Sequence, residues 1–496
     1  MQNRRIIFLL ILSAVLTGLA QQPLHVGFLA WFSLVPFLFI LQSIHKLSKG
    51  VWIGFIWGFF YYLSTIFWLA MNIGTTPLIG IISMLAAVLY CTLTSILICI
   101  TALFLKKYYP DNWSVAFPFI WTFIEFLRNR DILTGGPWTA LSNTQTEYLT
   151  LIQNAEISGI YGISLWLVFL NVCIFRWLNR PYPQRAFQLI IVFIFPWITG
   201  LILTPEIEIN KGKSVSVSVI QPNIHLSQKW KRGAAKSNMK LILDASQPAI
   251  NDSVKLVVWP ESATSAFIMQ KNTYYLNWIQ SHLNNSKLMT GVPYFEGEEP
   301  HRKFYNSAVM LSADSVYSLY HKLVLVPMAE HIPLSDIYPS LKELNFGQAN
   351  FTHGSSYTMY KVDGHAFAPM ICFESVLPWL SREFILRGAE VLVYLVNDGW
   401  YETAPEPQQH AKQAIFRAVE SRRPVIRCTN TGISLVIDPG GNIKGELPLN
   451  EAGVINTVIY PKTALTFYTK YGDIFAVMSG IIILLFIAVI PFKKHD

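Results

Sequence analysis

Three residues that could carry out nucleophilic acyl chemistry each stand at the end of an apolar run. Glu261 closes the motif WPE, Lys322 closes the motif YHK, and Cys372 lies within ICFE. A thiolate can attack an acyl carbon, and a nearby carboxylate can take the thiol proton. A lysine can stabilise both the thiolate and the oxyanion that follows. Together these residue types indicate chemistry through a covalent acyl-cysteine.

The runs that precede these residues are expected to position them at the rim of a sheet. Cys372 follows a buried strand and is expected at a strand-to-helix turn, where a helix N-terminus favours thiolate; Ser375 could cap that helix. A proline stops the strand before Glu261, so that its carboxylate would project beyond the sheet. Each residue alone also has a plainer interpretation: a buried cysteine, a surface carboxylate or a solvated strand-end lysine.

Residues 205–470 alternate short β-rich runs with helical ones, which predicts an α/β fold with helices covering the sheets. The expected strands span 214–221, 255–259, 287–292, 307–312, 316–320, 366–372, 391–397, 425–429 and 434–437. The expected helices span about 228–247, 273–285, 376–387 and 407–421.

The rest of the chain is apolar enough to cross a membrane. Hydrophobic residues make up 52% of the sequence and charged residues 14%, where about a quarter is usual. Runs near the length of ~20 residues that spans a bilayer core occur at about 5–20, 25–43, 51–72, 78–105, 113–129, 158–179, 186–203 and 474–492. We therefore expect a helical membrane domain of about seven spans over 1–204, a globular domain over 205–470, and a last span with a short tail over 471–496.

The net charge of +8 reflects topology rather than nucleic-acid binding. Residues 205–470 hold 25 Lys and Arg against 23 Asp and Glu, and the other basic residues lie beside the apolar runs. Alternating the loops places Arg128 and Arg130 on one side of the membrane. The other side receives Arg4, Arg5, Lys46, Lys49, Lys106, Lys107, Arg176, Arg180, Arg185, Lys493 and Lys494. The positive-inside rule makes this second side cytoplasmic, so both termini are inside and 205–470 outside.

Glu125 and the cysteines complete the list of chemically notable residues. Glu125 lies within an apolar run, which makes it a functional candidate, but pairing with Arg128 one turn later is the plainer expectation. The five cysteines show no metal-ligand spacing and no disulfide framework. No metal and no cofactor are expected.

Further motifs complete a resemblance to the nitrilase (carbon–nitrogen hydrolase) superfamily. They are YNS at 305–307, NDGW at 397–400 and NTG at 430–432, together with the ordered Glu, Lys and Cys. The resemblance covers nearly all of 214–460 and implies an αββα sandwich with a Glu-Lys-Cys triad. The membrane runs narrow it to the bacterial apolipoprotein N-acyltransferases, which the chain resembles in QPNI at 221–224, KW at 229–230, VPMAEHIP at 326–333 and GGPW at 135–138.

That resemblance assigns roles to the residues. It implies that Glu261 is the general base, Lys322 the oxyanion-stabilising lysine and Cys372 the nucleophile. The predicted supporting residues are Glu330, Glu374 and the backbone N–H of Phe373. The predicted substrate-binding residues are Trp230, Trp138, Trp400 and Tyr401.

The function implied is transfer of a phospholipid acyl chain, through a cysteine thioester, to the α-amine of the N-terminal diacylglyceryl-cysteine of bacterial apolipoproteins, the final step of lipoprotein maturation. The expected protein is a monomer of the bacterial inner membrane with a periplasmic catalytic domain and no nucleic-acid partner. One alternative is a membrane-tethered amidase of the nitrilase type acting on a small C–N substrate. Another is a catalytically silent module on a transporter or scaffold.

Overall fold

The chain forms two compact units. The computed structural model describes residues 2–130, 136–205, 214–252, 254–271, 273–333, 335, 337–338, 340, 350–401, 403 and 405–492. Unit 1 comprises residues 1–72, 76–204 and 470–496, and unit 2 comprises 73–75 and 205–469. Three residues named above, Gly135 of the motif GGPW and the basic pair Lys493 and Lys494, lie outside the described residues.

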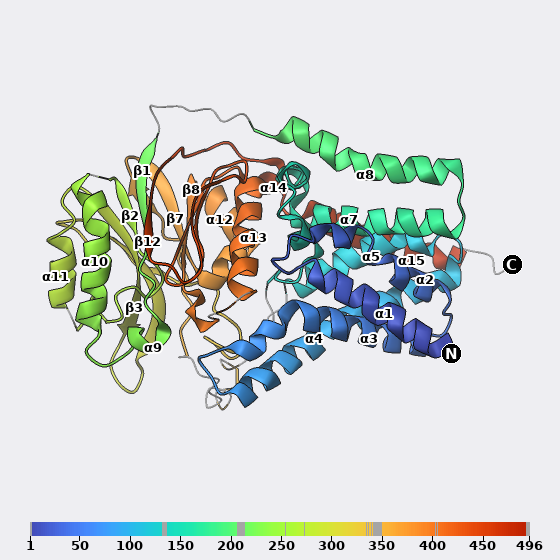
Figure 1. Cartoon of the computed structure of the whole chain (residues 1–496), viewed down its shortest axis with the longest axis horizontal. Helices are drawn as coiled ribbons and strands as arrows, with labels where there is room; N and C mark the ends of the chain where they lie inside the picture. Colours follow the sequence, from blue (N-terminus) through green and yellow to red (C-terminus); the bar gives the residue numbers. More distant parts are fainter. Residues whose placement is uncertain are drawn as a thin grey trace. The chain divides into compact units, whose positions relative to one another are not determined.

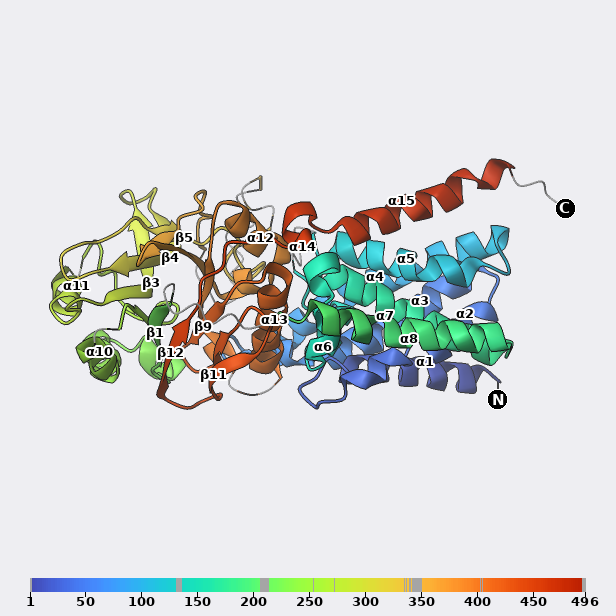
Figure 2. The same cartoon turned by 90° about the horizontal axis from the view of Figure 1, so that it is seen from above.

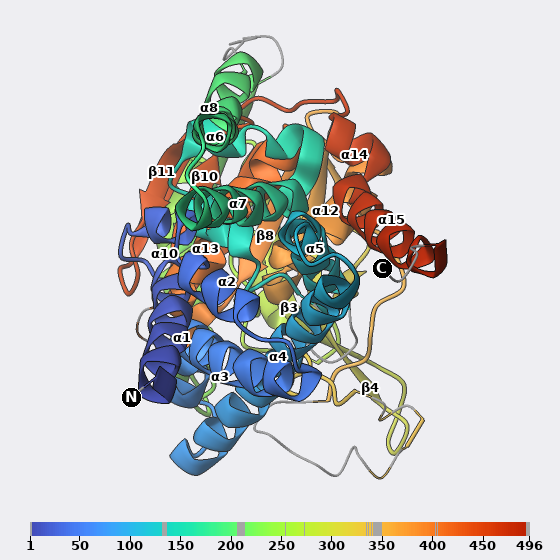
Figure 3. The ribbon, with the colours of Figure 1, turned by 90° about the vertical axis from the view of Figure 1, so that its right-hand side faces the viewer.

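Unit 1 is helical. Its main helices are α1 (Gln2–Leu19), α2 (Val35–Gln42), α3 (Leu47–Ile66), α4 (Pro77–Tyr108), α5 (Trp113–Arg128), α6 (Leu149–Ile152), α7 (Ala155–Asn179), α8 (Pro183–Leu203) and α15 (Ile474–Ala488). Prolines begin α4 and α8, at the first helical position where the missing N–H costs nothing. α15 lies beside α5 (Figure 2), and α8 lies beside α6 and α7 at the edge of the unit (Figure 3).

The predicted eight spans are not confirmed. Among the described residues, four helical segments are long and apolar enough to cross a membrane: Leu47–Met71, Pro77–Tyr108, Ala155–Asn179 and Pro183–Leu203. The segments Gly27–Gln42 and Ile474–Ala488 are apolar but shorter. Apolar runs in the sequence are therefore longer than some of the helices that they form.

The pairing of Glu125 with Arg128 remains a prediction, although the charges of the two side chains act on each other. The Glu125 carboxylate accepts hydrogen bonds from the Ser164 hydroxyl at 2.6 Å and the Leu141 N–H at 3.0 Å. The Arg128 guanidinium donates to the Tyr62 hydroxyl at 3.0 Å and to its neighbour Asn129. Partners on other elements, Ser164, Leu141 and Tyr62, therefore add to the partners that Glu125 and Arg128 have nearby in the chain, Trp121 and Asn129.

Unit 2 is a sandwich of two six-stranded sheets with the strand orders β12-β1-β2-β3-β4-β5 and β11-β10-β9-β8-β7-β6. The first sheet contains β1 (Val215–Gln221), β2 (Leu256–Val258), β3 (Lys287–Glu296), β4 (Lys303–Leu311), β5 (Tyr320–His321) and β12 (Gly453–Ile459). The second contains β6 (Tyr360–Val362), β7 (His365–Ile371), β8 (Val391–Val396), β9 (Val425–Thr429), β10 (Ser434–Ile437) and β11 (Ile443–Leu447). In each sheet the three central strands are parallel and the outer pairings antiparallel.

Helices cover both outer faces of this sandwich. Those of unit 2 are α9 (Leu226–Lys229), α10 (Ala235–Asn251), α11 (Thr273–Gln280), α12 (Pro378–Leu386), α13 (Glu406–Ser421) and α14 (Phe467–Tyr471), whose last two residues fall in unit 1. α10 and α11 lie outside one sheet and α12 and α13 outside the other (Figure 1). Fully buried Trp259 belongs to the core under α10, where its indole N–H donates to the Ser246 hydroxyl at 2.9 Å. The predicted αββα sandwich is confirmed.

Several predicted elements of unit 2 differ in detail. The helix expected over 228–247 is divided into α9 and α10, and Gly233 between them has a φ of +84°. Ser375 caps no α-helix, because residues Cys372–Val376 form the 3₁₀ helix η6. Leu377, before Pro378, stays extended with ψ 105°, as sterics before a proline require, and α12 starts only after it.

Candidate active site

The nucleophile candidate Cys372 lies where β7 passes into η6. Its φ of 51° is in the left-handed region, which a residue other than glycine adopts only when its surroundings hold it there. The Ser375 hydroxyl donates to the Cys372 carbonyl at 2.7 Å, which fixes the turn from within. Phe373, second in η6, carries an N–H that has no acceptor inside the helix. The turn thus places the Cys372 thiol next to a backbone N–H that has no acceptor within η6.

Glu261 lies in the loop that follows β2. Its main chain runs so close to Gly291 of β3 that a Cβ there would lie 2.6 Å from the Glu261 Cα, so only glycine fits. The buried Lys229 ammonium donates to the Glu261 carbonyl at 3.0 Å. The Asn306 amide donates to the Glu261 carboxylate at 2.6 Å. The carboxylate is buried, and both its main chain and one of its oxygens are held.

Lys322 follows the short strand β5 and is fully buried. Its ammonium forms an ion pair with the Glu330 carboxylate at 2.7 Å. Its N–H donates to the carbonyl of Asn306, the residue whose amide also reaches the Glu330 carboxylate at 3.1 Å. Asn306 therefore ties Glu261, Lys322 and Glu330 together.

The charges of these groups act on one another. Burial raises the pKa of the Cys372 thiol, the Glu261 charge raises it further, and the Lys322 charge opposes both. Burial also raises the pKa of Glu261, against the charge of Lys322. Burial alone would lower the pKa of Lys322, but the charges of Glu330, Cys372 and Glu261 outweigh it and raise that pKa. The surrounding charges therefore favour the cationic form of Lys322, and its charge acts on both the Glu261 carboxyl group and the Cys372 thiol.

Glu374 is buried two residues after Cys372. Four donors reach its carboxylate at 2.6–3.0 Å: the hydroxyl of Tyr320 and the N–H groups of Leu323, Val324 and Ile371. Burial raises the pKa of Glu374 to about 7, although these bonds favour the carboxylate. Glu374 thus links the segment after Lys322 to the nucleophile turn.

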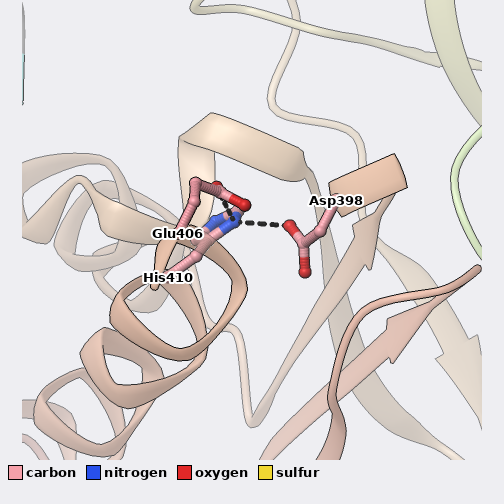
Figure 4. Close-up of side chains that lie close together, drawn as sticks. All are labelled: Asp398, Glu406 and His410. Carbon is pink, nitrogen blue, oxygen red and sulfur yellow. Dashed lines mark hydrogen bonds and ion pairs between the residues drawn. The ribbon is translucent and has the colours of Figure 1, made fainter. Parts of the chain in front are cut away.

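A second buried network lies beneath that turn. The His410 ring contacts the Ser375 hydroxyl through Nε2 at 2.9 Å and the Asp398 carboxylate through Nδ1 at 2.8 Å. Asp398 also accepts from Arg427 at 2.8 Å. Burial alone would raise the pKa of Asp398, but the charges of Arg427 and His410 and their hydrogen bonds outweigh it and lower that pKa to about 2. Figure 4 shows Asp398, Glu406 and His410 pointing toward one another.

These three side chains have the residue types of a metal site, and their ligand atoms lie within 4.8 Å of one another. The arrangement already supplies a cation, however, because the Arg427 guanidinium is paired with Asp398. Each His410 nitrogen also has a protein partner. The network therefore connects the nucleophile turn with the segment Asp398–Trp400 without any ion.

The structure brings some of the predicted site residues together and places others elsewhere. Glu261, Lys322, Glu330 and Cys372 act on one another as one cluster. Trp230 follows α9 with about half of its surface exposed, and the Lys229 ammonium lies 5.9 Å from its ring centre.

The remaining predicted substrate-binding residues occupy other places. Trp400 ends the short 3₁₀ helix Asp398–Trp400, and Tyr401 follows it. Trp138 belongs to unit 1, where its ring packs against Trp68 at a centroid distance of 5.2 Å. The binding roles of these residues remain predictions.

Sequence reasoning gave no roles to Asn306, Lys229, Asp398 and His410. The first three lie in the motifs YNS, KW and NDGW, so the motifs themselves were a usable signal. Lys229 is buried and has its pKa lowered to about 8 by burial, against the charge of Glu261. His410 stands in no motif, and only the fold shows that it lies below Cys372.

Comparison with known proteins covers both units. Residues 13–173 match the model of the apolipoprotein N-acyltransferase N-terminal domain, and 216–464 match that of carbon–nitrogen hydrolase. The chain is 30% identical to the apolipoprotein N-acyltransferase of Geobacter metallireducens, over 95% of this chain and 93% of that protein. It is 28% identical to that of Chlorobaculum tepidum, over 94% and 93%. The carbon–nitrogen hydrolase structure from Helicobacter pylori G27 covers 50% of this chain and 89% of its own at 17% identity and a TM-score of 0.38.

Proposed function

The chain belongs to the apolipoprotein N-acyltransferase family, and from that premise we propose that it completes bacterial lipoproteins by N-acylation. In this reaction an acyl chain passes from a membrane phospholipid to the α-amine of an N-terminal diacylglyceryl-cysteine. Cys372 carries the acyl group as a thioester between the two substrates. The likeness extends over both units, so the proposal does not rest on the triad motif alone.

One observation carries the chemical assignment. Cys372 stands at a strained turn, and the charges of Glu261 and Lys322 both act on its pKa. A thiol with a raised pKa needs a base to become a nucleophile, and Glu261 is the carboxylate with remaining acceptor capacity. Lys322, locked as a cation by Glu330, is placed to hold negative charge on oxygen.

Acylation of the enzyme is the first half-reaction. Glu261 takes the proton of the Cys372 thiol, and the thiolate attacks the carbonyl carbon of the phospholipid ester. The Lys322 ammonium and the Phe373 N–H hold the oxyanion, and each donor of this kind contributes ~10²–10³ in rate. The C–O bond then breaks, and Glu261 returns its proton to the departing lysophospholipid. A thioester on Cys372 remains.

Deacylation repeats the same steps with an amine as nucleophile. The free α-amine of the lipid-modified cysteine attacks the thioester carbon, and the same donors hold the second oxyanion. Glu261 takes the amine proton, the C–S bond breaks, and the thiolate of Cys372 recovers that proton. The products are an amide and free enzyme, so the two substrates react in ping-pong order.

The membrane setting suits these substrates. Within its described residues, unit 1 has four helical segments able to span a bilayer by length and composition, and both proposed substrates carry acyl chains. Anchoring enzyme and substrates in one membrane raises their effective concentration. In this proposal both termini are cytoplasmic, and the catalytic unit 205–470 lies on the periplasmic side of the inner membrane. Trp230, Trp138, Trp400 and Tyr401 are proposed to contact the substrates.

The test is to capture the thioester on the full-length protein. Purified protein is incubated with phospholipid labelled in its acyl chain, and the label is mapped by peptide mass spectrometry. We expect hydroxylamine-labile label on Cys372 in the wild type and none after Cys372→Ala. Cys428→Ala is the matched control, because Cys428 is buried against carbonyls of β1 and β2. An unlabelled Cys372 while lipoprotein peptide is still acylated would contradict the covalent mechanism.

A chase with acceptor peptide separates this function from the amidase alternative. A diacylglyceryl-cysteine peptide with a free α-amine should remove the label and become N-acylated, whereas an N-acetylated peptide should not. Release of the label as free fatty acid at the same rate with both peptides would instead indicate a hydrolase. The comparisons give the amidase alternative less support, because an amidase function would not explain why residues 13–173 match the N-terminal domain of the acyltransferase family.

A further inference from the structure

A cavity of about 330 Å³ lies in unit 1 between α7 and α8, closed on one side by Val115 of α5. Its wall on α7 is formed by Phe169, Val172, Cys173 and Arg176, and its wall on α8 by Arg185, Gln188, Ile191 and Val192. Residues spaced three and four apart fall on one face of a helix. The cavity is therefore a groove between two facing helix stripes.

The groove has a cationic end and an apolar end. Arg176 in the last turn of α7 and Arg185 in the first turn of α8 form the cationic end. Seven residues on each helix, or ~10 Å at 1.5 Å per residue, separate the arginines from the far end at Phe169 and Val192. That depth is less than one leaflet, since the hydrocarbon core of a bilayer is ~30 Å thick.

The far end of the groove is closed by a side-chain contact. The indole N–H of Trp166, about one turn before Phe169 on α7, donates to the Val192 carbonyl on α8 at 2.7 Å. Beyond it, Asn154 donates to the Pro196 carbonyl at 2.7 Å. Side-chain hydrogen bonds thus join α7 and the residue before it to α8 beyond the far end of the groove.

The two arginines differ in how they are satisfied. Arg185 donates to the carbonyls of Arg176 at 2.8 Å and Arg180 at 3.1 Å, at the end of α7. Among the residues that the structure describes, no hydrogen bond or ion pair engages the Arg176 side chain, and the groove lining contains no carboxylate. A guanidinium at the mouth of an apolar groove favours binding of an anion with an apolar tail, because the charge pairs with the anion and the groove accepts the tail.

We propose that this groove binds one anionic phospholipid, with its phosphate on Arg176 and Arg185 and the start of one acyl chain between α7 and α8. The end of α7 and the start of α8, which carry the two arginines, lie at the end of unit 1 where α1 begins and α15 ends (Figure 1). The sequence places the basic loops at that end, and basic pockets between membrane helices on the cytoplasmic side bind anionic head groups. This lipid holds α8 to the bundle and is distinct from the acyl donor of the proposed reaction, on which the inference does not rest.

The binding test uses native mass spectrometry of the full-length protein released from neutral detergent. Phosphatidylglycerol and phosphatidylcholine with the same acyl chains are added separately. We expect one tightly retained phosphatidylglycerol on the wild type and weaker retention of phosphatidylcholine. Arg176→Gln and Arg185→Gln should each weaken phosphatidylglycerol retention about fivefold, the effect of one surface cation on an anionic lipid.

Arg180→Gln is the matched control, because Arg180 lies one turn beyond Arg176, is exposed and does not line the groove. It should retain the lipid like the wild type. Equal losses for Arg180→Gln and Arg176→Gln would overturn the proposal, because general surface charge would then explain binding. Cys173→Phe, which fills the groove without changing charge, should also weaken retention, and unchanged retention would overturn the placement of the acyl chain.

A competition experiment with inorganic phosphate distinguishes a lipid site from a site for free anions. Phosphate alone at millimolar concentration should leave phosphatidylglycerol retention unchanged, whereas full displacement would identify a free-anion site and overturn the lipid assignment.

Thermal unfolding gives a second measurement. Arg176→Gln has no described partner to lose, so its unfolding temperature without lipid should match the wild type. With phosphatidylglycerol, the wild type and Arg180→Gln should gain stability and Arg176→Gln should gain less. An equal gain in all three would contradict the proposal.

Discussion

Glu261 and Glu374 are both buried glutamates whose surroundings include Cys372 or its turn, but they differ in the number of donors that reach them. Four donors converge on Glu374 from the end of β7, from β5 and from the segment after it. Among the described residues, a single donor, the Asn306 amide, reaches the Glu261 carboxylate. A carboxylate offers about four lone-pair sites, so Glu374 is saturated and Glu261 is not.

The pKa values alone would not separate these two residues. Burial raises the pKa of both, to about 7 for Glu374, and the charge of Lys322 opposes it in both. A perturbed pKa marks a candidate for function, but structural carboxylates are perturbed as well. A carboxylate that acts as a base must have lone pairs that are not already occupied by hydrogen-bond donors, whereas a structural carboxylate has them filled. By this criterion Glu261 is the candidate base and Glu374 the structural residue.

The largest expected effect comes from Glu261→Gln. The glutamine still accepts the Asn306 hydrogen bond but cannot take a proton, so thioester formation should slow by about 10²–10⁴-fold. The unfolding temperature should stay close to that of the wild type. Rapid-quench labelling of Cys372 and thermal unfolding of the same sample measure both quantities. Labelling within tenfold of the wild type would show that another group removes the thiol proton.

Glu374→Gln should reverse this pattern. The amide NH₂ of glutamine cannot accept, so two of the four donors lose their acceptor at about 1–3 kcal/mol each. We expect a free energy of unfolding lower by about 2 kcal/mol or more, with acylation in the folded fraction reduced less than tenfold. Denaturant unfolding followed by labelling at matched folded fractions checks this. A loss of labelling equal to that of Glu261→Gln, with stability retained, would place Glu374 in the chemistry.

Asn306→Ala should change the pH dependence. The Asn306 hydrogen bond lowers the pKa of Glu261, so its removal raises that pKa. Glu261 acts as a base only when deprotonated, so the acid limb of the rate should move to higher pH, by about one to two units for the loss of a hydrogen bond to a charged group. The rate should fall about tenfold or more below the limb and recover above it. A pH–rate profile of thioester formation tests this, and an unmoved limb would show that Asn306 does not tune Glu261.

The sequence was sufficient to locate residues that directly follow a strand in the chain. Glu261, Lys322 and Cys372 each come directly after an apolar run, so local pattern and motif locate them at a sheet edge. Asn306 needed pairing information, because its role depends on β4 lying beside β5, where Ser307 pairs with His321. Lys229 was missed because a lysine beside a tryptophan is typical of an exposed helix end, and tertiary packing buries it instead.

The same distinction applies to whole elements. Buried parallel strands such as β8 are continuous apolar runs and were predicted, whereas the edge strands β6 and β11 mix polar and apolar residues and were not. In unit 1, apolar composition predicted a span over 113–129, but α5 is a 16-residue helix with Pro118 inside. Composition locates apolar chain, and the helix length that forms depends on packing and on proline.

The smallest expected effect tests the network beneath the nucleophile. The Ser375 hydroxyl donates to the Cys372 carbonyl and contacts His410, so it holds the strained turn without touching the thiol or the substrate. Ser375→Ala removes a hydrogen bond of about 0.5–1.5 kcal/mol, and we expect thioester formation to slow about twofold to tenfold with KM for phospholipid unchanged. Ser375→Thr keeps a hydroxyl and should restore the rate, whereas a purely structural role would lower the unfolding temperature in Ser375→Ala without slowing acylation of the folded protein. Ser375→Ala could instead slow the reaction as much as Glu261→Gln does. The hydrogen bonds that hold the turn would then matter as much as the free acceptor capacity of the base. In that case the contrast between Glu261 and Glu374 would no longer identify the catalytic carboxylate.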